Sequence, residues 1–430
     1  MSTLELVAPQ TPAGAQPHHG ADVHSPDGHY WAELSDVASA GVGSRVLFAT
    51  DDWFSAAERM LVDSPPEFDP AAFTDWGKTM DGWESKRKRV AGHDWSVVEL
   101  GLPAVIRGLE LDTGFFTGNQ VPAVSIQAGC LDAGAAAALA ATRDQAGVAA
   151  GGGFAADAAA QLAADALDTV QWTEILPQTK LDPGYEDTRY HFFGLEEALA
   201  APPAGGGWTH LRVNMFPDGG LSRLRVRGEV VPAIEAGAAQ ELDMAAIENG
   251  GVAIEASNKH YGRPANLIAQ GRAAQMNEGW ETARNPNRPA VLEVDNDGKL
   301  LLSDDQFDWA IIRLGCLTQI TKLEVDTNHF KGNCPESCEL QGAVVPLGGV
   351  PRADEAGACE RLPDAEWATI LPRTNLTPHF QHYFSVSDED GGGLTPGAPA
   401  VTHVRLRIFP DGGVSRLRVC GTPVTTASKL

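Results

Sequence analysis

The sequence has few cysteines and no cysteine-based motif, which argues against two classes of stabilised domain. Its six cysteines form no Cys-x-x-Cys pair, and only Cys130 lies in the first half of the chain. Zinc sites usually need about four ligands at short spacings, and disulfide frameworks need paired cysteines. We therefore expect reduced thiols, which predicts a reducing compartment and hence a cytoplasmic location.

Positive charge and long apolar runs are also scarce. The chain has 32 Lys and Arg residues against 57 Asp and Glu residues, for a formal net charge of −25. A protein this acidic lacks the basic face that nucleic acid or an anionic membrane surface requires. No stretch approaches the roughly 18 apolar residues that span a bilayer. We therefore expect no nucleic-acid partner and no membrane partner.

Targeting signals and familiar catalytic motifs are missing as well. Residues 1–29 are rich in Ala, Pro, Gly and His but have no basic or apolar signal region, so they are predicted to form a disordered tail. The chain contains no G-x-S-x-G, no H-E-x-x-H and no Walker loop. What remains is a 430-residue chain, 43% hydrophobic, which is apolar enough to form a sizeable core.

Most of this chain is an internal duplication with a period of about 200 residues. The matching segments occur in the same order in both copies: residues 82–85 with 279–282, 112–119 with 326–333, 172–177 with 367–372, and 209–228 with 402–421. A period of this length indicates a repeated domain, because solenoid units are only about 20–50 residues long. We place the first repeat at residues 30–235 and the second at 236–430.

Each repeat is predicted to be all-β. Apolar and polar residues alternate in 210–216, the Pro-Asp-Gly-Gly of 217–220 is typical of a turn, and alternation resumes in 221–226, which predicts a hairpin. Further short strands are expected at 95–100, 108–112 and 124–128, and in the second copy at 309–314, 320–326 and 338–341. Many short strands with Gly and Pro turns favour a β-sandwich. Residues 133–167 are predicted as an inserted helix and loop, and 388–399 as a loop.

Ionisable and aromatic residues gather in three segments of the first copy, at 49–54, 77–95 and 112–119. Loops of this composition at one end of a sandwich are a plausible ligand site. Arg or Lys would hold a carboxylate there, and Glu or His would move protons. The basic run 86–89 is either a solvated face or a patch that steers a small anion.

Taken together, the motifs resemble the allantoicase (allantoate amidinohydrolase) family over nearly the whole chain beyond the tail. The resemblance lies in residues 46–54, 77–84, 86–89, 92–95, 112–119 and 124–127, and in the second copy in 260–262, 279–284, 326–333 and 409–413. It implies two tandem jelly-roll, galactose-binding-like β-sandwiches, hydrolysis of allantoate to ureidoglycolate and urea in allantoin degradation, and a homo-oligomer.

The resemblance also suggests which residues carry the chemistry. Releasing urea from allantoate requires a proton for the leaving nitrogen, a hydroxyl for the carbon, and a cation for the carboxylate. The candidate catalytic residues are Glu84, His93, His260, His329 and Asp51, and the candidate substrate-binding residues are Lys78, Arg87, Asp81, Asp112, Arg284 and Glu281. No spacing demands a metal, although a divalent ion held by His and Asp is possible.

Two departures from the family pattern keep alternatives open. Asn258 stands where the second copy usually carries an acid, and residues 285–307 are rewritten, with Phe307 where His is usual. One alternative is therefore a family member without activity. Another is a non-catalytic, lectin-like small-molecule binding protein, because a fold alone does not fix function.

Overall fold

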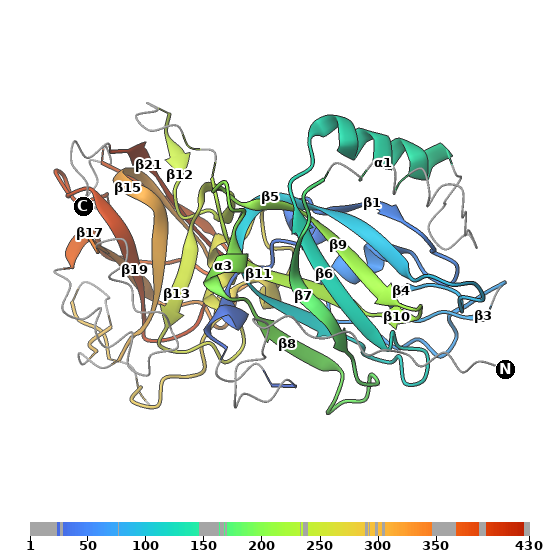
Figure 1. The fold of residues 1–430 in the computed structure, drawn as a ribbon. Helices are drawn as coiled ribbons and strands as arrows, with labels where there is room; N and C mark the ends of the chain where they lie inside the picture. The colour runs from blue at the N-terminus through green and yellow to red at the C-terminus, as the bar shows by residue number, and fades with distance from the viewer. Residues whose placement is uncertain are drawn as a thin grey trace, which may run out of the picture. The chain divides into compact units, whose positions relative to one another are not determined.

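The computed structural model describes residues 24–25, 29–75, 77–145, 163, 167, 170–232, 234, 240–288, 291, 293–296, 300–302, 306–345, 367–386 and 393–424. These form two compact units: unit 1 is Met1–Ala32 with Asp36–Gly228, and unit 2 is Glu33–Ser35 with Glu229–Leu430 (Figure 1). Apart from residues 24, 25 and 29, the expected tail lies outside the described residues. Most of 146–167 and residues 388–392 also lie outside them.

Both units consist mainly of strands. Unit 1 contains β1 (Arg45–Ala49), β2 (Phe73–Thr74), β3 (Gly77–Lys78), β4 (Trp83–Glu84), β5 (Asp94–Asp112), β6 (Ala123–Gly129), β7 (Thr173–Lys180), β8 (Tyr190–Gly194), β9 (Trp208–Phe216), β10 (Gly220–Leu221), β11 (Arg223–Val230), helices α1 (Ala133–Gln145) and α3 (Glu197–Ala200), and 3-10 turns η1 (Tyr30–Glu33), η2 (Ala40–Val42) and η3 (Ala57–Leu61). Unit 2 contains β12 (Leu242–Asp243), β13 (Val252–Ala256), β14 (Trp280–Glu281), β15 (Asp308–Asp326), β16 (Ser337–Ala343), β17 (Ala368–Asn375), β18 (Gln381–Ser385), β19 (Val401–Phe409), β20 (Gly413–Val414), β21 (Arg416–Pro423), and 3-10 turns η4 (Ile247–Asn249), η5 (Pro264–Ile268) and η6 (Met276–Glu278).

One long strand organises each unit. The first part of β15 pairs with β13 and β19, and its second part pairs with β18 and β21. Strand β5 does the same with β1 and β9, then with β8, and it also pairs with β11. Each long strand thus belongs to both layers of its sandwich. The expected all-β fold, with two tandem β-sandwiches, is confirmed.

The predicted hairpin and the predicted split of the long strands are wrong. Strands β9 and β11 both pair with β5 and are not partners of each other. Residues 95–100 and 108–112 are one strand of 19 residues, with a shift in register between Glu99 and Ala104. The Pro-Asp-Gly-Gly segment does not close a hairpin, because its glycines lead into β10, which pairs with β4.

The core of each unit lies between its two layers, where the apolar residues of the alternating strands meet. In unit 2 the core includes Trp280, Ile312, Leu323 and Leu406, all almost fully buried. In unit 1, α1 adds a further apolar layer on the outer face of the sheet beside β1, where its Leu139 joins a buried cluster (Figure 1). No helix among the described residues is long and apolar enough to cross a membrane.

Candidate functional site

A two-residue strand in each unit carries a Trp-Glu pair, and the two copies hold it in the same way. In unit 1, the fully buried Trp83 donates from Nε1 to the main-chain oxygen of Asp51 over 2.8 Å. In unit 2, Trp280 donates in the same way to the main-chain oxygen of Asn258 over 2.9 Å. The buried indoles therefore fix the position of the glutamate that follows each tryptophan.

The Pro-Asp-Gly-Gly segment holds the residue that follows the Trp-Glu pair through two hydrogen bonds. The Ser85 N–H donates to the Gly219 carbonyl over 3.1 Å, and the Gly219 N–H donates to Ser85 Oγ over 3.2 Å. Thr282 and Gly412 repeat both bonds in unit 2, each at 3.0 Å. Gly219 and Gly412 have φ of 132° and 135°, a conformation that glycine adopts without strain. The repeated glycine thus holds the residue after the Trp-Glu pair and does not form the turn of a hairpin.

Glu84 is a buried carboxyl group with one oxygen bonded and the other unpaired. Its exposed fraction is 5%, and Asn119 donates from Nδ2 to its Oε1 over 2.6 Å. Its Oε2 has no hydrogen-bond partner within the described part of the chain. Burial raises the pKa of Glu84 to about 7, although the bond from Asn119 opposes this shift. The carboxyl is therefore suited to proton transfer near neutral pH.

Asp51 is a second buried carboxylate that holds the same segment. Its exposed fraction is 3%, and its Oδ1 accepts from the main-chain N–H groups of Trp53 over 2.9 Å and Lys86 over 3.1 Å. Burial raises the pKa of Asp51 to about 6, and the nearby Asp94 carboxylate adds to the rise. At neutral pH Asp51 is therefore mostly ionised, whereas Glu84 is partly protonated.

Asn258 accepts the same two main-chain hydrogen bonds as Asp51 but carries no charge. Its Oδ1 accepts from the main-chain N–H groups of His260 over 3.0 Å and Ala283 over 2.9 Å. These bonds match those of Asp51 residue for residue. An amide therefore supports the fold at this position as well as a carboxylate does, but it adds no group that takes up a proton.

The residues of the basic run 86–89, which follows Glu84, differ in their contacts. Lys86 places its Nζ 4.8 Å from the centre of the Trp53 ring, and Lys88 donates from Nζ to Asp94 Oδ1 over 2.6 Å. Arg87 is exposed, and its side chain forms no hydrogen bond or ion pair with the residues that the structure describes. Arg89 is exposed as well, so Arg87 and Arg89 are the cations of this run that are open to an anionic ligand.

Lys78, in β3, contacts residues of the preceding loop. Its Nζ donates to the Asp69 carbonyl over 2.8 Å and lies 4.7 Å from the centre of the Phe68 ring and 5.1 Å from that of Phe73. These contacts tie β3 to the preceding loop. The structure does not bring the Lys78 ammonium group to Glu84 or Asp51 by any contact among the described residues.

Two of the candidate substrate-binding carboxylates are held in ion pairs. Asp112 is almost fully buried, and Arg189 donates to its Oδ1 over 2.9 Å and to its Oδ2 over 2.6 Å. Asp81 accepts from Arg223 Nη2 over 2.8 Å and from Arg59 Nη2 over 3.0 Å. Because their charges are already matched, these two groups are suited to holding loops together rather than to binding a substrate.

His93 packs on the outer face of the sheet. Its ring lies 4.4 Å from the ring of Phe216, and its Nε2 is 3.2 Å from Asn214 Oδ1. Burial lowers the pKa of His93, so the ring is neutral at pH 7. In unit 2 an aromatic pair, Phe307 with Phe409, takes the place of this contact. The position therefore accepts a purely apolar ring.

In unit 2 the structure keeps the glutamate pair but changes its surroundings. Asn333 donates from Nδ2 to Oε1 of Glu281, which is half-buried. Arg284 is exposed, like Arg87, and its side chain forms no hydrogen bond or ion pair with the described residues. His260 is also exposed, with its ring 4.5 Å from that of Tyr261.

His329 is held by the backbone around it. Its Nε2 lies 2.9 Å from the Ala273 carbonyl, and its own N–H donates to His379 Nδ1 over 2.8 Å. Its φ of 72° matches the φ of 69° at Phe115, so the two residues occupy equivalent left-handed positions. The contact of Nε2 with a carbonyl makes His329 a bracing residue of its loop.

A cavity of about 570 Å³ lies behind β4, with Ser55 and Phe54 in its wall. Its wall contains the carboxylate residues Glu58, Glu67, Asp69 and Asp81 and the guanidinium of Arg59. A wall with this excess of negative charge disfavours an anion.

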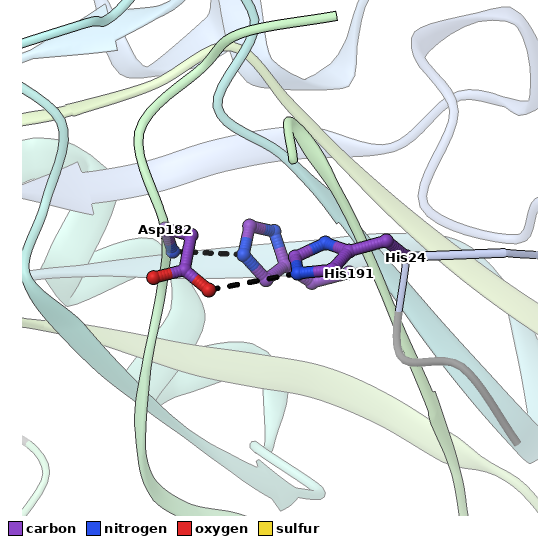
Figure 2. Close-up of side chains that lie close together, drawn as sticks. All are labelled: His24, Asp182 and His191. Atoms are coloured by element: carbon purple, nitrogen blue, oxygen red, sulfur yellow. Dashed lines mark hydrogen bonds and ion pairs between the residues drawn. The ribbon is translucent and has the colours of Figure 1, made fainter. Parts of the chain in front are cut away.

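His24, Asp182 and His191 are the one group of possible metal ligands among the described residues (Figure 2). His24 Nε2 lies 3.5 Å from Asp182 Oδ2, and His191 Nε2 accepts from the Asp182 N–H over 2.8 Å. His191 Nδ1 lies 3.1 Å from the Arg189 carbonyl. Both nitrogens of His191 are thus engaged by the backbone, so this cluster is poorly suited to a metal ion. In unit 2, His382 Nε2 accepts from the Thr377 N–H over 2.8 Å, and its Nδ1 lies 3.1 Å from the Val325 carbonyl.

Sequence reasoning did not nominate Asn119, which is the hydrogen-bond partner of Glu84. A signal for it was present, because Asn119 and Asn333 end the same repeated motif while Glu84 and Glu281 are kept in another. The retention of both members in both copies indicates a pair. It is the structure that brings them together.

The fold and the site define this chain as a tandem β-sandwich protein with a duplicated Glu–Asn site. Comparison with known proteins then supplies the family, because the model of the allantoicase repeat matches residues 35–231 and 242–424. The chain belongs to the allantoicase family.

Similar proteins agree with this assignment. The chain is 38% identical over 405 residues to a probable allantoicase of Pseudomonas aeruginosa (strain UCBPP-PA14), covering 93% of this chain and 98% of that protein. It is 38% identical over 390 residues to probable allantoicase 1 of Burkholderia mallei, covering 90% and 94%. The crystal structure of the Saccharomyces cerevisiae allantoicase is similar with a TM-score of 0.60 at 27% identity, covering 92% of this chain and 98% of that one.

Proposed function

We propose that this protein is an active allantoicase that hydrolyses allantoate to ureidoglycolate and urea, with its reacting groups in unit 1. The observation that carries the proposal is Glu84, a buried carboxyl with one unpaired oxygen and a pKa of about 7. Most buried carboxylate oxygens have a hydrogen-bond partner, so an unpaired oxygen at a buried site supports a functional role. Family membership supports the substrate.

The two buried carboxyl groups of unit 1 divide the acid and base work. Glu84, partly protonated at pH 7, gives its proton to the leaving ureido nitrogen as the carbon–nitrogen bond breaks. Asp51, mostly ionised, takes a proton from the water whose oxygen bonds to that carbon. Environments that separate two carboxyl pKa values are a recurring way to assign such roles. The proton taken by Asp51 balances the one that Glu84 gave.

Arg87 holds the carboxylate of allantoate in this proposal. Its exposed guanidinium follows Glu84 by three residues, and a guanidinium binds a carboxylate through paired hydrogen bonds. His93, Lys78, Asp81 and Asp112 then act outside the reaction, because each is engaged in packing or ion pairs. On the same grounds His329 is a bracing residue, and His260, Glu281 and Arg284 belong to a separate site in unit 2.

The direct test is urea release from allantoate by the purified protein, with and without a chelator. Stoichiometric urea and ureidoglycolate are expected, and chelator sensitivity decides whether a divalent metal takes part. A folded protein that binds allantoate without releasing urea would favour the lectin-like or inactive alternative.

We also propose a cytoplasmic homo-oligomer. The five cysteines that the structure describes are free thiols, as expected for a reducing compartment. The oligomer rests on the family resemblance. Cell fractionation and light scattering on the purified protein test the two statements separately.

A further inference from the structure

Unit 2 repeats most of the residues that form the candidate site of unit 1. Glu281 accepts from Asn333 as Glu84 does from Asn119, and Trp280 fixes it through the Asn258 carbonyl. Arg284 follows Glu281 by three residues and is exposed, as Arg87 is after Glu84. The order of an acceptor, a cation three residues later and an amide partner further along the chain is therefore the same in both units.

The chemistry that this site lacks is the second carboxylate. Asn258 replaces Asp51 while keeping the same two main-chain hydrogen bonds, so the site retains its shape and loses its base. Glu281 is half-buried, whereas Glu84 is 5% exposed. A site that keeps recognition groups but lacks the acid–base pair binds a ligand without converting it.

The remaining groups select one class of ligand. The free guanidinium of Arg284 suits a carboxylate. Oε2 of Glu281 makes no hydrogen bond to the described residues, and it suits an N–H donor such as a ureido nitrogen. His260 and Tyr261 add an exposed aromatic pair at the position where unit 1 has Trp53.

We propose that unit 2 holds a second, non-catalytic binding site for a small carboxylate that carries a ureido group, formed by Glu281, Asn333, Arg284 and His260. The choice of ligand class rests on the proposed function of unit 1. Each chain then binds two molecules of ligand and turns over one.

The number of binding sites tests the proposal. Titration calorimetry of the Glu84→Gln chain with allantoate, which this variant is expected to turn over only slowly, should give two sites per chain. Adding Arg284→Ala should lower the number to one, and adding Glu281→Gln should weaken the same site. Adding Arg87→Ala instead should remove the other site. Lys322→Ala, on the exposed side of unit 2, is the matched change of charge and should leave two sites.

The outcomes separate this proposal from the function of unit 1. One site per chain that Arg284→Ala does not affect overturns the second site, and so does an absence of binding. Urea release by the wild-type protein reports on unit 1 alone. Equal thermal unfolding midpoints for Arg284→Ala and its parent show that the binding site is lost without a loss of folding, as expected for an exposed side chain.

Discussion

Asn119 donates a hydrogen bond from Nδ2 to Oε1 of Glu84 over 2.6 Å, and the two residues are 35 positions apart in the sequence. The amide stabilises the ionised form of the carboxyl, while burial favours the neutral form. The balance leaves the pKa of Glu84 at about 7. The pair therefore sets the proton affinity of the group on which the proposed reaction depends.

Replacing Glu84 with Gln should lower kcat for urea release by about 10²- to 10⁴-fold, because it removes a general acid but keeps the shape of the side chain. Steady-state assays with saturating allantoate measure the effect. Glu174→Gln makes the same change on an exposed residue of β7 and is the matched control. A kcat close to that of the wild type would remove Glu84 from the reaction.

Removing the amide of Asn119 should shift the pH profile in one direction. Activity requires a protonated Glu84, so kcat/KM should fall as pH rises through about 7. Asn119→Ala deletes the bond that lowers the pKa of Glu84, so this basic limb should move to higher pH. The acidic limb, set by the pKa of Asp51 near 6, should stay in place. A basic limb that does not move would contradict the assignment.

Glu84 should also make the protein less stable as pH rises. Its pKa is raised from 4.5 to about 7 in the folded state, so the folded protein binds this proton more tightly than the unfolded chain. The stabilisation is present below about pH 4.5 and is lost as pH rises through 7. Relative to wild type, Glu84→Gln should gain about 3 kcal/mol between pH 4 and pH 8. Guanidinium unfolding of both proteins at several pH values measures this gain, and a constant difference would argue against the raised pKa.

Two substitutions at Asp51 should separate its structural role from its chemical one. Asp51→Asn keeps the oxygen that accepts from Trp53 and Lys86, so stability should be retained while kcat falls and the acidic limb disappears. Asp51→Ala removes both bonds and should cost about 1–3 kcal/mol of unfolding free energy. Chemical unfolding and urea assays on the same samples test the pair. Full activity in Asp51→Asn would exclude Asp51 as the base.

Asp112 should matter for folding and not for turnover. Asp112→Asn leaves the half-buried Arg189 without its carboxylate partner, which should lower the free energy of unfolding by about 1–3 kcal/mol. The KM of the folded fraction should stay unchanged. Asp187→Asn, on an exposed part of the neighbouring loop, provides the control. A raised KM with unaltered stability would return Asp112 to the substrate site.

The sequence was enough to predict the duplication, the all-β class and the family. It was not enough for the strand pairing, because residues 210–216 and 221–226 alternate as a hairpin would, yet each pairs with β5. Local alternation shows which face of a strand is buried, but not which strand lies beside it. That choice is made by a 19-residue strand long enough to serve both layers.

The candidate site was likewise predictable only in part from the sequence. Glu84 and Asp51 could be nominated from composition and repetition, and the structure gives both buried positions with raised pKa values. Asp81 and Asp112 were nominated by the same criteria. Their partners Arg223 and Arg189 lie 142 and 77 positions away. No local sequence pattern reveals that a carboxylate is already neutralised by an ion pair. The sequence therefore could not separate Asp81 and Asp112 from Glu84 and Asp51.

The indole of Trp83 bonds to the main chain of residue 51 and not to its side chain, and Trp280 treats residue 258 in the same manner. Every amino acid offers that carbonyl. The scaffold therefore accepts either a carboxylate or an amide at this position, because both also offer the side-chain oxygen that receives the two main-chain N–H bonds. Such an arrangement makes the fold evolvable, because after duplication one copy could exchange an acid for an amide and take on a different task while its architecture stayed intact.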